Sequence, residues 1–106
     1  MPYTYRQMRQ TKARHYARNK ERYIKAAKIR RLVNRALVTA AKGGPCVDCG
    51  RRFPTVCMDL DHVRGAKKFE LGNSAGRNAA AVIDEIAKCD AVCSNCHRIR
   101  TFSSLA

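Results

Sequence analysis

The sequence is poor in acidic residues and has no long apolar run. Its 106 residues include 8 Asp or Glu against 22 Lys or Arg, for a formal net charge of +14. This imbalance favours a polyanionic partner, foremost nucleic acid, over an acidic small molecule. No segment approaches the roughly 18 apolar residues of a membrane span, and the N-terminus lacks the apolar run of a signal sequence. We therefore expect a cytoplasmic protein without membrane association, although a mature secreted chain would also lack its signal.

Helix-breaking residues are missing from the first part of the chain. Between Arg6 and Lys42 there is neither Gly nor Pro, and Ala, Arg, Lys and Leu are frequent, so a long basic helix is predicted that ends at residues 43–45, "GGP". Its apolar face carries Ile29, Val33, Ala36 and Ala40, and a different face carries Lys28, Arg31, Arg35 and Lys42. The apolar stripe weakens before Tyr23. This leaves three alternatives for the first turns: a separate helix, a frayed end, or a segment that orders on nucleic acid.

Charge divides the chain into two parts. Residues 1–42 contain 13 Lys or Arg and one acid, Glu21, whereas residues 43–106 contain 9 Lys or Arg and 7 acids. We therefore predict a basic helical DNA-binding arm over 1–42 and a separate core over 43–106 that keeps its acids for local use. Since a core of this size buries little apolar surface, a further stabilising device is expected.

Six cysteines are available for that device. In a reducing cytosol they are more often metal ligands or free thiols than disulfides. Two pairs have the Cys-x-x-Cys spacing that lets a turn direct both thiolates at one ion, and four such ligands suit tetrahedral Zn²⁺. The predicted ligands of a structural zinc are Cys46, Cys49, Cys93 and Cys96. The alternative is a mixed site that recruits Cys57, Cys89 or His62.

Short strands and helices are predicted for the second part of the chain. The segment "VCMDLDHV" alternates in polarity and predicts a strand over 57–62, and "DAVC" predicts a second strand over 90–93. Gly, Asn and Ser make 63–89 a loop, which contains a helix over 79–88 with Val82, Ile83 and Ile86 facing inward. A last helix is expected to follow Ser94 as its N-cap.

The acids and the histidine of "MDLDHV" indicate a candidate hydrolytic site. Alternation puts Asp59 and Asp61 on one face and His62 on the other, unless the strand ends at Asp61 and the backbone turns. With such an end, Asp61 can bind a hard divalent cation while neutral His62 accepts a proton from water. His97 follows the last zinc cysteine, and it can share that ion if the cysteine turn closes back on the strand. Asp59 either supports the metal or is an ordinary surface or salt-bridged residue.

The pattern "CVDCG…MDLDHV…CDAVCSNCHR", over about residues 46–100, resembles the HNH endonucleases. The resemblance is to the zinc-stapled kind, in which four cysteines hold a zinc ion, found in many bacteriophage genomes. It implies an α+β fold with a small ββα-metal (His-Me finger) core, in which a two-stranded hairpin with a long connection is followed by a helix. It also implies hydrolysis of DNA phosphodiester bonds, by nicking or double-strand cleavage, in the host cytoplasm if a phage encodes the protein.

Residue roles follow from the resemblance. It makes His62 the general base that activates water, and it makes Asp61 and His97 the ligands of a catalytic Mg²⁺ or Mn²⁺. The four cysteines become structural. The middle Asn of the family pattern has no clear counterpart, because "AKCDAVC" precedes the last cysteine pair without one. The candidates for that position are Asn73, Asn78 and Asn95.

Basic side chains are predicted to contact the phosphate backbone. They are Lys28, Arg31, Arg35, Lys67, Lys68, Arg98 and Arg100. Two other functions fit the same residues. One is a non-catalytic zinc module that binds DNA or RNA, which would show no cleavage with any divalent cation. The other is an accessory factor of a phage DNA-packaging terminase complex, which would bind terminase subunits.

Overall fold

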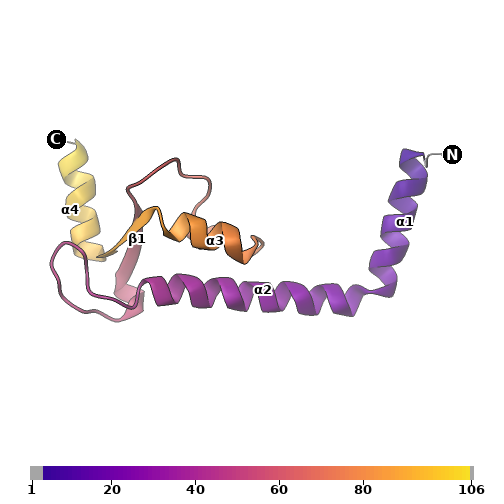
Figure 1. The fold of residues 1–106 in the computed structure, drawn as a ribbon, viewed down its shortest axis with the longest axis horizontal. Coiled ribbons are helices and arrows are strands. Elements are labelled where there is room, and N and C mark those ends of the chain that lie inside the picture. Colours follow the sequence, from indigo (N-terminus) through magenta and orange to yellow (C-terminus); the bar gives the residue numbers. More distant parts are fainter. Residues whose placement is uncertain (1–3, 106) are drawn as a thin grey trace.

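A computed structural model describes residues 4–105 and shows an α+β protein. Its helices are α1 (Tyr5–Arg18), α2 (Lys20–Ala41), α3 (Ala79–Ile86) and α4 (Ser94–Leu105). Its strands, β1 (Met58–His62) and β2 (Cys89–Cys93), form one antiparallel sheet, and two 3₁₀ turns, η1 (Thr55–Cys57) and η2 (Leu71–Asn73), precede β1 and α3. Figure 1 shows the hairpin, α3 and α4 gathered at one end of α2, with α1 at the other end.

The basic helix predicted for the first part of the chain is two helices that meet at Asn19. This residue ends α1 and precedes α2, with φ −117° and ψ 19°. Its side-chain Nδ2 donates to the carbonyl of His15 at 2.9 Å, and such local bonding competes with a continuous helix. A capping box between Thr4 and Gln7 begins α1. Because none of its residues is buried and it stands away from the core (Figure 1), α1 is the separate helix among the three alternatives.

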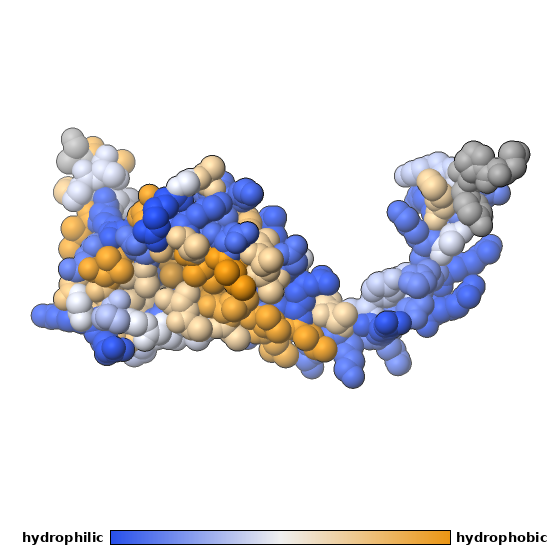
Figure 2. Space-filling model, viewed as in Figure 1, coloured by the Kyte–Doolittle hydropathy of each residue, from blue (hydrophilic) through white to orange (hydrophobic). Residues whose placement is uncertain are grey.

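The C-terminal half of α2 packs on the core. Asn34 is buried there, and Leu37 and Val38 pack against an apolar cluster that includes residues of α3 and η2. Part of the apolar stripe stays outside, since Ile29 and Val33 are 52% and 43% exposed. Figure 2 shows apolar side chains along α2, in contrast to the hydrophilic α1. Composition therefore changes at residue 43, whereas tertiary packing begins within α2.

The two predicted strands pair over their full lengths. Asp61 lies opposite Asp90, and His62 lies opposite Cys89. β1 starts at Met58, one residue later than expected, because Cys57 belongs to η1. β2 starts at Cys89, one residue earlier than expected. The alternative in which β1 ends at Asp61 does not hold, since pairing continues through His62. Strand alternation therefore leaves Asp59 and Asp61 on one face and His62 on the other.

The helix in the connection, α3, is shorter than expected and turned differently. Asn78 caps it by accepting a hydrogen bond from a backbone N–H at 2.8 Å. Its buried residues are Val82 and Glu85, whereas Ile83, expected inward, is 52% exposed. A helical repeat of 3.6 residues places residues 82, 85 and 86 on one face. Glu85 therefore faces inward, where Ile83 was expected.

The last helix, α4, follows β2 without a linker. It begins at Ser94 itself, whose hydroxyl donates to the carbonyl of Cys57 at 3.1 Å instead of capping the helix as expected. Two small apolar clusters stabilise the core, one around Met58 and Val92 and the other around Val82. Within residues 4–105, every helix is too short or too polar to cross a bilayer.

Candidate metal centre and active site

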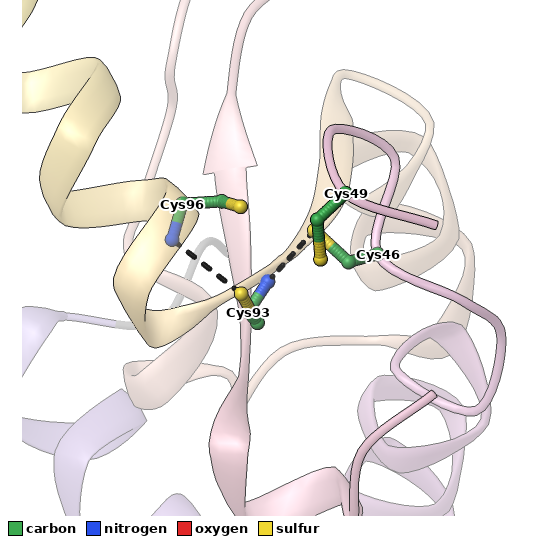
Figure 3. Close-up of side chains that lie close together, drawn as sticks. All are labelled: Cys46, Cys49, Cys93 and Cys96. Atoms are coloured by element: carbon green, nitrogen blue, oxygen red, sulfur yellow. Dashed lines mark hydrogen bonds between the residues drawn. The ribbon is translucent and has the colours of Figure 1, made fainter. Parts of the chain in front are cut away.

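Four cysteines from two distant segments meet beside the hairpin. Cys46 and Cys49 lie in a tight turn after α2, and Cys93 and Cys96 lie at the end of β2 and in the first turn of α4 (Figure 3). Their Sγ atoms are all within 4.8 Å of one another. Gly50 closes the turn with a positive φ of 71°, which glycine adopts without strain. The backbone N–H of Val47 donates to the carbonyl of Ala91 at 2.9 Å, and this bond holds the turn beside β2.

The cluster fits a tetrahedral zinc ion. Zn–S bonds of about 2.3 Å place four tetrahedral sulfurs about 3.8 Å apart, which these side chains reach with small movements. The backbone N–H of Cys93 donates to Sγ of Cys46 at 3.3 Å, and that of Cys96 donates to Sγ of Cys93 at 3.4 Å (Figure 3). Within residues 4–105, no other group of three or more Cys, His, Asp or Glu has its ligand atoms this close. The four predicted cysteines can therefore hold zinc, and Cys57 and Cys89 lie outside the cluster.

The thiols of this cluster differ in acidity. Burial raises the pKa of the Cys46 thiol, but backbone N–H donors, first that of Cys49 and then that of Cys93, outweigh it and lower the pKa to about 6. A hydrogen bond with Cys93 and burial raise the pKa of Cys96 to about 12. Sulfurs this close repel one another if all ionise, so a cation among them favours the thiolates.

The hairpin face under α4 carries the proposed ligands of a second metal. His97, in the first turn of α4, reaches two acids of β1. Its Nδ1 lies 3.0 Å from Oδ2 of Asp59, and its Nε2 lies 3.6 Å from Oδ1 of Asp61. Because an ionised carboxylate can only accept, the closer contact places the proton of a neutral ring on Nδ1, and Nε2 of that ring then has its lone pair on the side of Asp61.

This geometry suits a divalent cation between Asp61 and His97. Histidines that bind metals commonly donate their other ring N–H to a carboxylate, which fixes the ring, and Asp59 occupies that position. A gap of 3.6 Å fits two atoms that each bind one ion at about 2.1 Å. Two protein ligands would leave most positions of an octahedral cation to water and substrate.

Arg100, one of the predicted phosphate contacts, binds carboxylates of its own chain. Its guanidinium donates to Asp48 in the cysteine turn at 2.6 Å, to Asp61 at 3.0 Å and to Asp90 at 3.2 Å. The bonds between Arg100 and Asp48 lower the pKa of that carboxyl and raise the pKa of the guanidinium. Arg100 therefore ties the cysteine turn to the hairpin and orients Asp61, and we do not retain it as a phosphate contact.

His62 lies on the other face of β1 and is bonded to a buried acid. Its Nε2 is 3.0 Å from Oε2 of Glu85, whose side chain is 1% exposed. Glu85 also accepts from Nζ of Lys88 at 2.8 Å and from the backbone N–H of Lys68 at 3.1 Å. The Lys88 bond, against the opposing effect of burial, is the main cause that lowers the pKa of Glu85 to about 2. With Glu85 ionised, Nε2 carries the proton, and Nδ1 of a neutral His62 can accept one.

Residues from both faces of β1 border a single hollow of about 280 Å³. Asp59 and His97 line it from the α4 side, and Leu60 and His62 line it from the α3 side. Both sides reach one space because, within residues 4–105, β1 pairs with a strand along one edge only, that of β2. A backbone turn at Asp61, the alternative considered above, is therefore not needed for His62 and His97 to reach the same hollow.

The other predicted phosphate contacts lie in three places. Those on one side of α2 are Lys28, Arg31 and Arg35. Lys67 pairs with Glu70 in the loop before η2, and the Lys68 side chain is exposed there. Arg98 is exposed on α4 and lines a hollow that adjoins His97. These bases remain predicted phosphate contacts.

A buried asparagine outside the three candidates holds the loop. Asn34 of α2 donates from Nδ2 to the carbonyls of Ser74 at 2.8 Å and of Arg77 at 2.7 Å. Its Oδ1 is buried and has no hydrogen-bond partner within residues 4–105. Of the residues considered for the middle Asn, Asn78 caps α3 and Asn73 lies in η2. The loop before α3 is therefore held by a residue of α2, which lies outside the loop itself.

Sequence reasoning missed Asn34 and Glu85, although each carries a detectable signal. Both are polar residues that lie, at helical spacing, on the same inward-facing side of a helix as apolar residues. Asn34 precedes Leu37 by three positions, and Glu85 follows Val82 by three. A polar residue on such a face is buried only with specific partners, so it marks a structural or functional contact.

Comparisons of the chain with protein-family models, with curated proteins and with solved structures gave no match.

Proposed function

We propose that this protein is a small HNH-type endonuclease that hydrolyses DNA phosphodiester bonds with a divalent cation. The approach of Nε2 of His97 to Oδ1 of Asp61, at 3.6 Å, is the observation that carries the proposal. The order of β1, β2 and α4, which agrees with a ββα-metal core, supports it further. So does the hollow that His97 shares with His62, a histidine backed by a buried carboxylate.

The cysteine cluster gives the proposed site its rigidity. With zinc bound, the ligands would fix the start of α4, and His97 directly follows the ligand Cys96. A structural zinc in a small domain contributes an apparent folding free energy of about 10 to 16 kcal/mol. The position of His97 over β1 thus depends on the zinc, although His97 is not one of its ligands.

Each side chain has a role in the proposed hydrolysis. A cation held by Asp61 and His97 would stabilise charge on the phosphate and on the departing 3′ oxygen. His62 accepts the proton of the attacking water at Nδ1, while Glu85 holds the ring and stabilises its protonated form. Asp59 keeps the proton of His97 on Nδ1, so that Nε2 stays available to the cation.

Divalent-dependent nicking of supercoiled plasmid tests the proposal. The wild-type protein should nick plasmid with Mg²⁺ or Mn²⁺ and not without an added divalent cation, with zinc content measured in both samples. His62→Ala should lower the nicking rate by about 10² to 10⁴ while DNA binding is retained. His97→Ala should abolish the response to divalent cations.

His15→Ala is the matched control for these variants. The third histidine of the chain is exposed on α1, so its replacement should leave the nicking rate unchanged. If His62→Ala loses DNA binding and cleavage to the same extent, His62 serves the fold and the proposed role as base is wrong.

One observation favours a second candidate, a non-catalytic zinc module that binds DNA or RNA. The guanidinium of Arg100, a cation of the protein itself, pairs with Asp48, Asp61 and Asp90, so that Asp61 already has a cationic partner. Such a module would bind nucleic acid and leave plasmid intact with every divalent cation. An accessory role in a phage terminase complex stays a prediction, and co-purification with terminase subunits would test it.

A further inference from the structure

A basic groove lies between α2 and the loop around η2. Its α2 side carries Lys28, Arg31, Arg35 and Lys42. Spacings of three, four and seven residues bring these four bases to one face of the helix. The opposite side, around η2, carries the small residues Gly72, Ser74 and Ala75. The groove has a volume of about 470 Å³, with positive charge along one wall and little side-chain bulk along the other.

This groove continues into the hollow of the proposed active site. The residues that line both are Val38, Lys42, Leu71 and Gly72. On its other side, the hollow that His62 and His97 line adjoins a third hollow, which Arg98 borders. Asp59 and His97 line both of these hollows. One path therefore leads from the exposed half of α2, past the proposed catalytic groups, to the outer face of α4.

The small-residue wall is fixed relative to the basic wall. Asn34 of α2 holds the carbonyls of Ser74 and Arg77 at 2.8 and 2.7 Å, so the loop cannot move off without leaving these groups unpaired. Next to it, a Cβ placed at Gly72 would meet nothing within 4 Å, so the backbone there is open to the groove. The width of the groove is thus set by the fold.

The four basic side chains of the α2 wall are free to bind an anion. Within residues 4–105, none of the four forms an ion pair. The acids that border the path have partners, because Glu70 pairs with Lys67 and Asp59 bonds to His97. A chain of phosphates would therefore find unpaired positive charge along the groove and hydrogen-bonded carboxylates at its end.

We propose that this groove, the α2 track, binds the phosphate backbone of the cleaved strand on one side of the scissile bond. The inference rests on the proposed nuclease function and adds the path of its substrate. At about 1.5 Å per residue, the stretch from Lys28 to Lys42 is about 21 Å long. Along the duplex axis, one strand of B-form DNA advances about 3.4 Å per nucleotide, so the track covers at most about six nucleotides. A linear polyanion matches basic side chains that are spread over this length.

Two triple variants of α2 test the track. The track variant combines Lys28→Gln, Arg31→Gln and Arg35→Gln. The control variant combines Arg22→Gln, Lys25→Gln and Arg30→Gln, three exposed residues of the same helix that do not line the groove. Both remove three positive charges and introduce the same good helix former, so they are matched in charge and helix propensity and differ in whether the changed residues line the groove.

Binding is measured first, by fluorescence anisotropy with labelled single-stranded and duplex DNA over a range of salt concentrations and without an added divalent cation. Three lost phosphate contacts should reduce the slope of log K against log salt by about 2 to 3 in the track variant. The control variant should reduce the slope by clearly less, because its three residues belong to the basic arm but lie outside the groove. Equal slopes for the two variants, with both single-stranded and duplex probes, would overturn the track.

Cleavage is measured second, with nested duplexes that carry from two to about twelve nucleotides beyond the cut. For the wild type, the rate should rise with the length of one flank up to about six nucleotides and then level off. The control variant should keep this dependence, and the track variant should lose it. A rate that does not depend on either flank in the wild type would contradict the track.

The two measurements separate failure of the track from failure of the proposed function. If the wild-type protein cleaves nothing, the nuclease proposal fails, and the anisotropy comparison still decides whether the α2 track binds DNA. If cleavage occurs and the two triple variants behave alike, the nuclease proposal stands and the track is wrong.

Discussion

Tertiary packing places the boundary between arm and core at the buried Asn34, within α2, instead of at residue 43. The arm as the structure bounds it, residues 4–33, and the core, residues 34–105, hold their charged side chains in different ways. In the arm no residue is buried, and the basic side chains of both helices are exposed. In the core, within the described residues, every acid except Asp84 has a side-chain partner, such as Arg100 for Asp48 and Asp61, and His62 for Glu85. Solvent surrounds the first set of charges, whereas packing fixes the second.

The two parts of the molecule are therefore suited to different tasks. Exposed charges on a helix without tertiary contacts attract a polyanion at long range but fix no geometry. Charges held at 2.6 to 3.2 Å by partners on other elements have defined positions, which an active site requires. We therefore expect changes in the core to alter stability and chemistry, and changes in the arm to alter affinity.

The largest effect is expected from loss of a zinc ligand. Cys93→Ser should remove bound zinc and most of its contribution of about 10 to 16 kcal/mol, so the core should unfold at room temperature. Metal analysis and thermal unfolding followed by circular dichroism would measure this. Cys57→Ser, which changes a thiol outside the cluster, is the control and should keep the zinc and the melting temperature. A stable Cys93→Ser protein with normal zinc content would show that the ligands are wrongly assigned.

A smaller effect is expected at Glu85, and it depends on pH. The pKa of Glu85 falls from its usual 4.5 to about 2 in the folded protein, chiefly through Lys88. A lowered carboxyl pKa stabilises the fold above the unfolded-state value, and that stability is lost as pH falls from about 4.5 towards 2. Glu85→Gln should therefore destabilise the protein at pH 7 and flatten the loss of stability between these two pH values.

Denaturant unfolding at several pH values would measure the Glu85 effect. Asp84→Asn, at the exposed neighbouring position of α3, is the control and should follow the wild-type curve. If the two variants respond to acid in the same way, the buried carboxylate does not contribute through its charge.

The smallest effect on stability, with the most selective effect on binding, is expected when α1 is removed. Deleting residues 1–18 should leave the melting temperature unchanged, because no residue of α1 is buried. DNA affinity should fall and the salt slope should flatten by up to about 4.5, since five basic side chains are lost and each phosphate contact contributes about 0.9. Anisotropy and calorimetry on the same sample measure both. A lowered melting temperature would mean that α1 packs on the core in solution.

Some of the candidate site could be predicted from local sequence alone. Two Cys-x-x-Cys pairs predict a four-sulfur cluster, because this spacing limits what a turn can do with two thiolates. The hairpin followed from alternation in "MDLDHV" and "DAVC". Arg100 was predicted as a phosphate contact, and its three carboxylates were missed because they come from separate segments of the chain. Local pattern does not contain such long-range partners.

By itself, the sequence determined the chemistry of this protein: an excess of positive charge in the arm, four thiols with ligand spacing, and two acids and two histidines near them. Tertiary structure alone decided which of these groups meet. It put His97 between Asp59 and Asp61, gave His62 the buried Glu85 as partner, and attached the loop to Asn34. The physical reason is that hydrogen bonds and ion pairs act over a few ångströms. Their partners are chosen by how helices and strands pack, and not by their distance along the chain.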